Sequence, residues 1–140
     1  MRGDLFLVDS SVWLEALPAR TAGQEIRDRV DTLLAEDRVA TTGMIQLELL
    51  GGARTEAEYR RLAELFSALH QLPASAETWA GAARLGFQLR RQGLPLPFTD
   101  LLIAAVAIAA EAVLLHRDRH FDLIAGRSTL RVESHLAAAS

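Results

Sequence analysis

The sequence predicts a three-layer α/β/α sandwich, in which a short, mainly parallel sheet lies between two layers of helices. Residues 5–8 (LFLV) and 113–115 (VLL) are short, wholly apolar runs, as expected of strands that are covered on both faces. Segments with apolar residues at helical spacing, such as 23–36, alternate with these runs, and this order favours a parallel sheet. We predict a single domain over residues 1–135 and a short tail over 136–140.

Caps, glycines and prolines set the expected limits of the elements. Thr55 and Glu58 have the spacing of a capping box, and Gly93 has the position of a C-terminal glycine cap. Residues 94–97 (LPLP) cannot be helical, and Thr99 is expected to cap the helix that follows. The expected strands are 5–8, 38–42, 70–72, 113–115 and 130–132. The expected helices are 10–17, 23–36, 44–50, 55–68, 76–92, 100–112 and 121–125.

Composition and charge exclude several classes of protein. The 140 residues contain no cysteine, which excludes disulfide scaffolds, cysteine-bound zinc and thiol catalysis. The 15 basic residues are all arginines, and the 18 acidic residues outnumber them. This balance argues against a simple basic nucleic-acid module. The apolar run 101–110 is too short to span a membrane, and the run at 5–8 is too short for a signal peptide. We therefore expect a soluble, cytoplasmic protein with no membrane partner.

Four acids fall where a parallel sheet would gather them. Asp9 directly follows the first expected strand, and Asp118 closely follows the fourth. Asp100 opens the helix before the fourth strand, and Glu48 lies in the helix after the second. Ligands of open α/β sheets bind outside the carboxyl ends of the strands, so these side chains could share one site. As an alternative to a shared site, Asp9 and Asp100 could simply cap helices, and Asp118 could be a turn residue. Asp122 is interpreted as solvent-facing or as a helix cap.

Glu48 favours a metal site in particular. It lies among apolar neighbours, the chain has no lysine, and the nearest arginine in sequence is Arg54. A carboxylate in apolar surroundings is costly unless it is paired, and clustered carboxylates repel unless one protonates or a cation neutralises them. His70, His120 and His135 lack metal-ligand spacing and are interpreted as surface or structural. Oxygen ligands alone suit Mg²⁺ or Mn²⁺, which predicts metal-assisted phosphodiester hydrolysis.

Three stretches of the chain resemble PIN-domain ribonucleases, and specifically the VapC-type toxins of bacterial toxin–antitoxin pairs. They are FLVDSSVWLEAL, TTGMIQLELLGGAR and PFTDLLIAAVAIAAEAVLLHRDRHFDLIA. Members of the family similarly have a strand ending in Asp followed by Ser or Thr, a Glu in an ELLxG-like helix, an Asp opening an alanine-rich helix, and an Asp after the last core strand. The resemblance implies a PIN-like, Rossmann-like fold and a Mg²⁺- or Mn²⁺-dependent endoribonuclease that acts on RNA.

The resemblance also implies roles for individual residues. Asp9, Glu48, Asp100 and Asp118 would form the acidic quartet, with Asp9 and Asp100 as the firmest metal ligands. Asp118 and Glu48 would act as a further ligand, as a water-orienting group or as support. Ser10 would be the small hydroxyl that bonds to the site.

One position departs from the family pattern. Many relatives have Ser or Thr two residues before the last Asp, where this chain has His116. His116 either replaces that hydroxyl as a hydrogen-bond donor or is a packed histidine at a strand end.

The resemblance further implies a homodimer and a VapB-like antitoxin, which together would form a heterotetramer or a larger complex. Arg54, Arg117 and Arg119 are the candidates for contacts with RNA phosphates, and solvated surface charge is the alternative for each. Two other functions stay open: a non-catalytic PIN-like module that binds protein or RNA, and another metal-dependent phosphohydrolase. The absence of lysine argues strongly against a receiver domain, and the absence of Asp-x-Asp after the first strand argues against a haloacid-dehalogenase-type phosphatase.

Overall fold

A five-stranded, fully parallel sheet forms the centre of this computed structural model, which describes residues 3–16 and 23–136. The strand order is β3-β2-β1-β4-β5, which confirms the predicted fold class. The strands are β1 (Phe6–Val8), β2 (Val39–Thr41), β3 (His70–Gln71), β4 (Val113–His116) and β5 (Arg131–Ser134). The end of the first expected helix at Leu17 and most of the expected tail, residues 137–140, lie outside the described residues.

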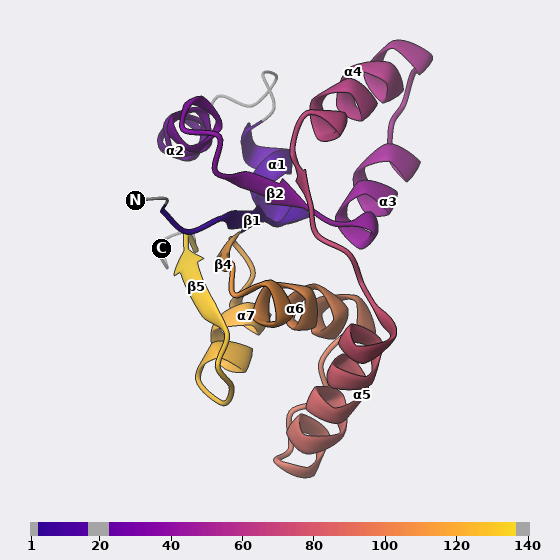
Figure 1. The fold of residues 1–140 in the computed structure, drawn as a ribbon, viewed down its shortest axis with the longest axis vertical. Helices are drawn as coiled ribbons and strands as arrows, with labels where there is room; N and C mark the ends of the chain where they lie inside the picture. The colour runs from indigo at the N-terminus through magenta and orange to yellow at the C-terminus, as the bar shows by residue number, and fades with distance from the viewer. Residues whose placement is uncertain (1–2, 17–22, 137–140) are drawn as a thin grey trace.

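Seven helices in the described part of the chain surround this sheet. They are α1 (Ser10–Ala16), α2 (Gln24–Ala35), α3 (Gly43–Gly51), α4 (Glu56–Ser67), α5 (Ala76–Arg91), α6 (Phe98–Ala110) and α7 (Arg119–Ala125). Figure 1 shows α1, α2 and α4 above the strands and α5 and α6 below them. Within the described ranges, none of these helices has the length and apolar character needed to cross a bilayer.

The order of the strands creates a switch point beside β1. From β1 the chain winds outward through β2 to β3, and it then returns to add β4 on the other side of β1. Val8 is in register with Leu115, and the backbone N–H of Asp9 donates to the Leu115 carbonyl at 2.9 Å. Ligands bind at such switch points in doubly wound sheets, and Asp9 and the residues after β4 are delivered there.

Helix α6 lies in the core because its small side chains let it approach the sheet closely. Its residues from Leu101 to Ala107 are all buried, and α5 packs along it. Above the sheet, Trp13 of α1 meets Phe66 of α4 edge to face, with 5.8 Å between the ring centroids. Helices α1 and α6, which lie beside the switch point, are therefore packed into the core.

Two expected helix caps differ from the structure. The prediction that Thr99 caps the alanine-rich helix is wrong: α6 begins at Phe98, and Leu101 N already donates to the Pro97 carbonyl at 3.1 Å. Pro97 has a fixed φ and needs no hydrogen-bond acceptor, so the helix can begin directly after it. The capping box is only half formed, because the Thr55 hydroxyl accepts from Glu58 N whereas Glu58 Oε2 accepts from Arg54 N.

Candidate active site

Asp9 is buried at the carboxyl end of β1, with 6% of its surface exposed. Its Oδ2 accepts hydrogen bonds from the backbone N–H and the hydroxyl of Ser11, at 3.1 and 2.6 Å. The same Ser11 hydroxyl accepts from Arg117 N at 3.0 Å, which ties the loop after β1 to the loop after β4. Ser11 is not among the site residues predicted from the sequence, although an Asp whose side chain accepts from the N–H two residues on forms a common Asx turn.

Ser10 supports the site through Glu48 rather than through Asp9. Its hydroxyl donates to Glu48 Oε1 at 3.2 Å, which joins α1 to α3. Glu48 is exposed, so the prediction that it lies in apolar surroundings is wrong. The apolar residues of α3 surround the whole helix, and Leu47 is itself 66% exposed. Partial desolvation raises the pKa of Glu48, and repulsion from Asp9 and Asp100 adds to that rise.

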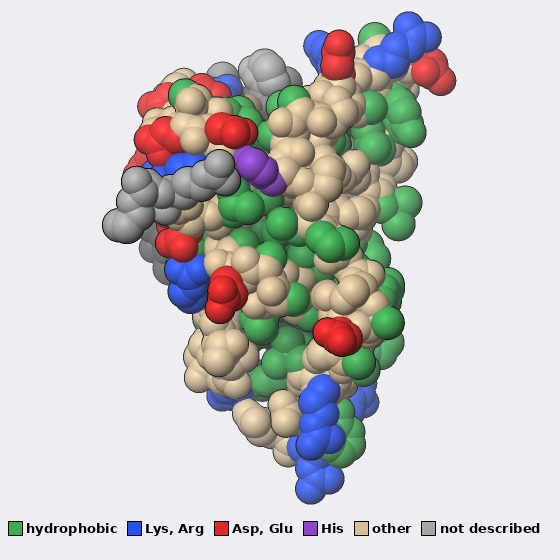
Figure 2. All heavy atoms as spheres, in the orientation of Figure 1, with side chains coloured by type: hydrophobic (Ala, Val, Ile, Leu, Met, Phe, Trp, Pro, Cys, Tyr) green, Lys and Arg blue, Asp and Glu red, His purple; other side chains and the backbone are tan. Residues whose placement is uncertain are grey.

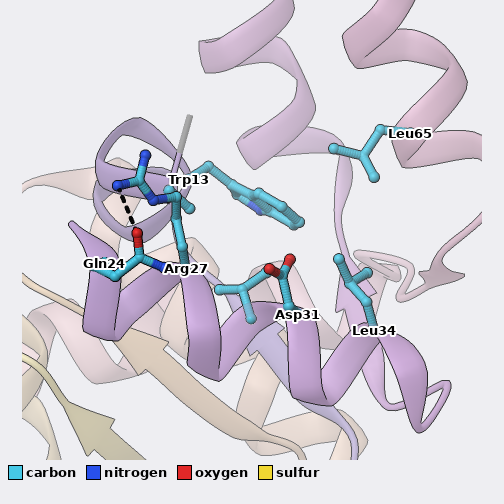
Figure 3. A pocket seen from close by; sticks show the side chains of 8 residues that line it. Trp13, Gln24, Arg27, Asp31, Leu34 and Leu65 are labelled. Carbon is cyan, nitrogen blue, oxygen red and sulfur yellow. Dashed lines mark hydrogen bonds between the residues drawn. The ribbon is translucent and has the colours of Figure 1, made fainter. Parts of the chain in front are cut away.

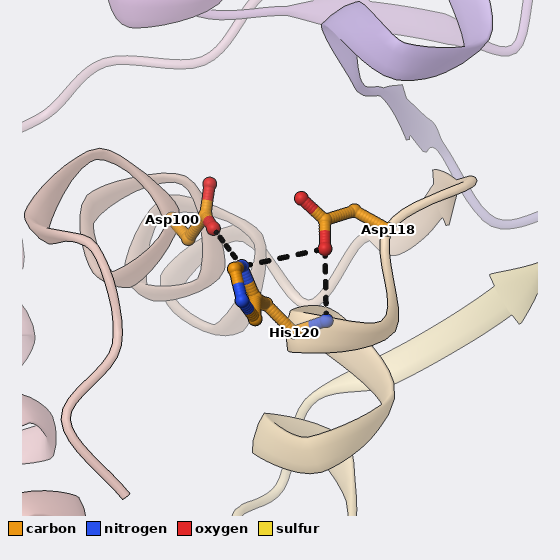
Figure 4. Close-up of side chains that lie close together, drawn as sticks. All are labelled: Asp100, Asp118 and His120. Atoms are coloured by element: carbon orange, nitrogen blue, oxygen red, sulfur yellow. Dashed lines mark hydrogen bonds and ion pairs between the residues drawn. The ribbon is translucent and has the colours of Figure 1, made fainter.

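Asp100 and Asp118 meet around the ring of His120 (Figure 4). His120 Nδ1 lies 2.9 Å from Asp100 Oδ2 and 3.3 Å from Asp118 Oδ1. Asp118 is the N-cap of α7, where its Oδ1 accepts from His120 N at 2.9 Å. Among the residues that the structure describes, these three form the one group of potential metal ligands whose ligand atoms all lie within 4.8 Å of one another. His120 was not predicted as a site residue, because i, i+2 spacing on a short helix carries no recognised ligand signal.

The acids of the site influence one another electrostatically. Burial raises the pKa of Asp100, the charges of Asp118 and Asp9 raise it further, and the hydrogen bond from His120 opposes this rise. The same repulsion acts between Glu48 and both Asp9 and Asp100. Electrostatic repulsion therefore links the four predicted acids, although Asp9 and Glu48 lie outside the tight group around His120. Such a set of oxygen donors, with one nitrogen, fits a divalent cation.

His116 is fully buried at the end of β4 and holds the loop that carries Asp118. Its Nδ1 accepts from the backbone N–H of Asp118 at 3.0 Å, so the neutral ring must carry its hydrogen on Nε2. Nε2 lies 3.1 Å from Asp122 Oδ1, and Asp122 Oδ2 accepts from the Ser134 hydroxyl at 2.9 Å. Burial lowers the pKa of His116, against the opposing charge of Asp122, in agreement with a neutral ring. Both oxygens of Asp122 are therefore engaged in supporting His116.

The three candidate arginines differ in their availability for RNA. Arg54 and Arg119 are exposed. Arg117 has a side chain only 21% exposed, and it pairs with Glu15 at 3.1 Å while its Nε donates to the His135 carbonyl at 3.0 Å. Arg117 is thus anchored within the fold, which leaves Arg54 and Arg119 as the members of the trio open to a phosphate.

Comparisons with known proteins agree with this architecture. A family model described as the PIN domain matches residues 6–127. Ribonuclease VapC11 of Mycobacterium tuberculosis is 34% identical over 134 residues, which cover 93% of this chain and 98% of that protein. Ribonuclease VapC18 of the same organism is 30% identical over 125 residues, covering 86% and 88%. The crystal structure of VapBC2 from Rickettsia felis, bound to a promoter DNA fragment, matches with a TM-score of 0.77 at 21% identity, over 94% of this chain and 98% of that one. The chain therefore belongs to the PIN domain family, among the VapC ribonucleases.

Proposed function

We propose that the protein is a Mg²⁺- or Mn²⁺-dependent endoribonuclease that acts as the toxin of a VapBC-type pair. The observation that carries this proposal is the electrostatic repulsion among the four predicted acids: Asp9 and Asp100 help to raise the pKa of Glu48, and Asp118 and Asp9 help to raise that of Asp100. Among the described residues no arginine forms an ion pair with any of the four. A divalent cation is the partner that would offset this repulsion.

Each residue has a definite task in this proposal. Asp9, Asp100 and Asp118 would hold the cation, which when bound polarises a phosphodiester and lowers the pKa of a water molecule. Ser10 holds Oε1 of Glu48, which leaves Oε2 to orient the attacking water. Oε2 of Glu48 would also accept a proton from that water. Arg54 and Arg119 would bind phosphates of the RNA on either side of the cleaved bond.

Hydrolysis of RNA in defined metal conditions tests this function. We expect the purified protein to cut structured or unstructured RNA in Mg²⁺ or Mn²⁺ and to be inactive in EDTA. A nuclease contaminant is controlled by the Asp9→Asn variant, purified in the same way, which should be inactive. Full activity in EDTA or in Asp9→Asn would overturn the proposal, and cleavage of a phosphomonoester but not of RNA would favour another phosphohydrolase.

A pocket of about 520 Å³ between α1, α2 and α4 suits an antitoxin segment (Figure 3). Trp13, Leu34 and Leu65 give it apolar walls, and Arg27 and Asp31 stand at its edge. We propose that a VapB-like antitoxin inserts an apolar segment here.

A different face suits a second copy of the chain. Figure 2 shows hydrophobic side chains gathered over α3 and α5, at the right-hand edge of the view. Leu47, Trp79, Phe87 and Phe98 are large apolar residues on α3, α5 and the start of α6, and Phe98 is 81% exposed. Exposed apolar surface of this kind marks interaction sites in soluble proteins. We propose that this face forms the homodimer, so that two toxins and their antitoxins assemble as a heterotetramer or a larger complex.

Two charge-introducing variants separate these surfaces. With a cognate VapB-like antitoxin co-expressed, Leu34→Asp should lose the antitoxin and remain dimeric. Leu47→Asp should keep the antitoxin and become monomeric, as measured by copurification and light scattering. Asp31→Arg, an exposed change at the mouth of the same pocket, replaces Leu34→Asp if that variant does not fold. Loss of both properties in either folded variant would contradict the assignment of two separate faces.

A further inference from the structure

The ring of His120 lies between two carboxylates that come from different parts of the fold. Asp100 belongs to the first turn of α6, and Asp118 caps α7, in which His120 is the second residue. A single ring nitrogen, Nδ1, contacts both carboxylates, at 2.9 and 3.3 Å (Figure 4). Because ionised carboxylates only accept hydrogen bonds, a hydrogen on Nδ1 occupies the space between these acids.

Nothing else in the described surroundings explains the position of this ring. The cap of α7 needs only the backbone N–H of His120, which donates to Asp118 Oδ1. The side chain is 32% exposed, and its polar contacts within the described residues are the two carboxylates alone. The other histidines that form ion pairs do so with acids outside the proposed metal site. The pairs are His70 with Asp37, His135 with Glu133 and His116 with Asp122.

We propose that His120 is a metal ligand through Nδ1, and that the site binds its cation with mixed oxygen and nitrogen donors. A cation that replaces the Nδ1 hydrogen, with the neutral ring then protonated on Nε2, could contact Asp100, Asp118 and His120 together, since their ligand atoms lie within 4.8 Å of one another. This inference rests on the metal site of the proposed function and adds a residue to it.

A nitrogen donor changes which cation the site prefers. Carboxylate and water oxygens suit Mg²⁺ and Mn²⁺, whereas imidazole suits later transition metals such as Ni²⁺ and Zn²⁺. The affinity of such a site should therefore rise steeply from Mg²⁺ through Mn²⁺ and Co²⁺ to Ni²⁺. Removing the imidazole should cost most for Ni²⁺ and least for Mg²⁺.

Metal titration of matched histidine variants tests the selectivity. In calorimetric titrations of the full chain, His120→Asn should weaken Ni²⁺ and Co²⁺ binding by at least about tenfold and leave Mg²⁺ binding almost unchanged. His120→Asp, which offers a carboxylate oxygen, should restore Mn²⁺ binding but not Ni²⁺ binding. His70→Asn, at the far edge of the sheet, is the control and should bind every metal as the unaltered protein does. Circular dichroism verifies that each variant is folded.

Pulsed electron paramagnetic resonance of bound Mn²⁺ tests the ligation directly. The unaltered protein and His70→Asn should show modulation from a coordinated imidazole nitrogen, and His120→Asn should lose it. Two results would show that His120 is a counter-ion: Mn²⁺ binding without nitrogen modulation, and Ni²⁺ binding by His120→Asn that is as tight as that of the unaltered protein or tighter. Either result would overturn this inference and leave the proposed function standing. Failure of the unaltered protein to bind any divalent cation would overturn the proposed function as well.

Discussion

Asp100→Asn is expected to reduce ribonuclease activity by at least about 10²–10³-fold and to raise the melting temperature of the metal-free protein. The loss of activity follows because Asp100 is a proposed ligand on the rigid first turn of α6. The gain in stability follows because burial, and then the charges of Asp118 and Asp9, raise the pKa of this carboxyl. An acid with a raised pKa in the folded state destabilises that state when it ionises, and asparagine does not ionise.

Because the pKa of Asp100 is raised in the folded state, the stability of the metal-free protein should fall as pH rises. Below the unfolded pKa of Asp100, near 3.8, both states are protonated and the cost is absent. As pH rises through the folded pKa, the metal-free protein loses stability, and Asp100→Asn should lose less of it. Melting temperatures measured in EDTA from pH 4 to pH 7 give the comparison, with the exposed Asp28→Asn as the control. A variant that melts lower than the unaltered protein at pH 7, or that keeps its activity, would contradict this account of Asp100.

His116→Leu should destabilise the protein by about 1–3 kcal/mol, because it leaves buried polar groups without partners. The backbone N–H of Asp118 loses its acceptor, and Asp122 Oδ1 loses its donor. The melting temperature should fall by roughly 3–8 °C. The loop that carries Asp118 should also loosen, so metal binding should weaken in parallel, as measured by calorimetry.

Asp122→Asn is the matched variant for His116. If the ring is neutral with its hydrogen on Nε2, the asparagine oxygen still accepts from it, and the asparagine amide can donate to the Ser134 hydroxyl. We therefore expect Asp122→Asn to change the melting temperature far less than His116→Leu does. An equal fall in melting temperature in the two variants would show that the charge of Asp122, rather than its hydrogen bonds to His116 and Ser134, stabilises this part of the fold.

Patterns that depend on the period of a strand or helix predicted the fold well, whereas contacts between distant segments could not be predicted. Asp9 and Asp118 could be placed together because the carboxyl ends of parallel strands share one edge of a sheet. The exposure of Glu48 could not be predicted, because α3 is apolar around its whole circumference and its sequence does not indicate which side faces the sheet. The ring position of His120 depends on how closely α6 approaches α7, which no local pattern encodes. The link from Ser11 to Arg117 N likewise joins residues 106 positions apart.

Three of the site carboxylates are each held by the protein through one oxygen. Ser11 engages Oδ2 of Asp9, Ser10 engages Oε1 of Glu48, and the His120 backbone engages Oδ1 of Asp118. Each of these donors fixes the orientation of its carboxylate, which would favour binding of a cation through one oxygen rather than through two. Calcium fills its six to eight positions partly with bidentate carboxylates, whereas magnesium accepts single oxygens at near-octahedral angles and keeps several waters. If these carboxylates bind a cation as proposed, the hydroxyl and amide donors behind them would favour a low coordination number and disfavour calcium.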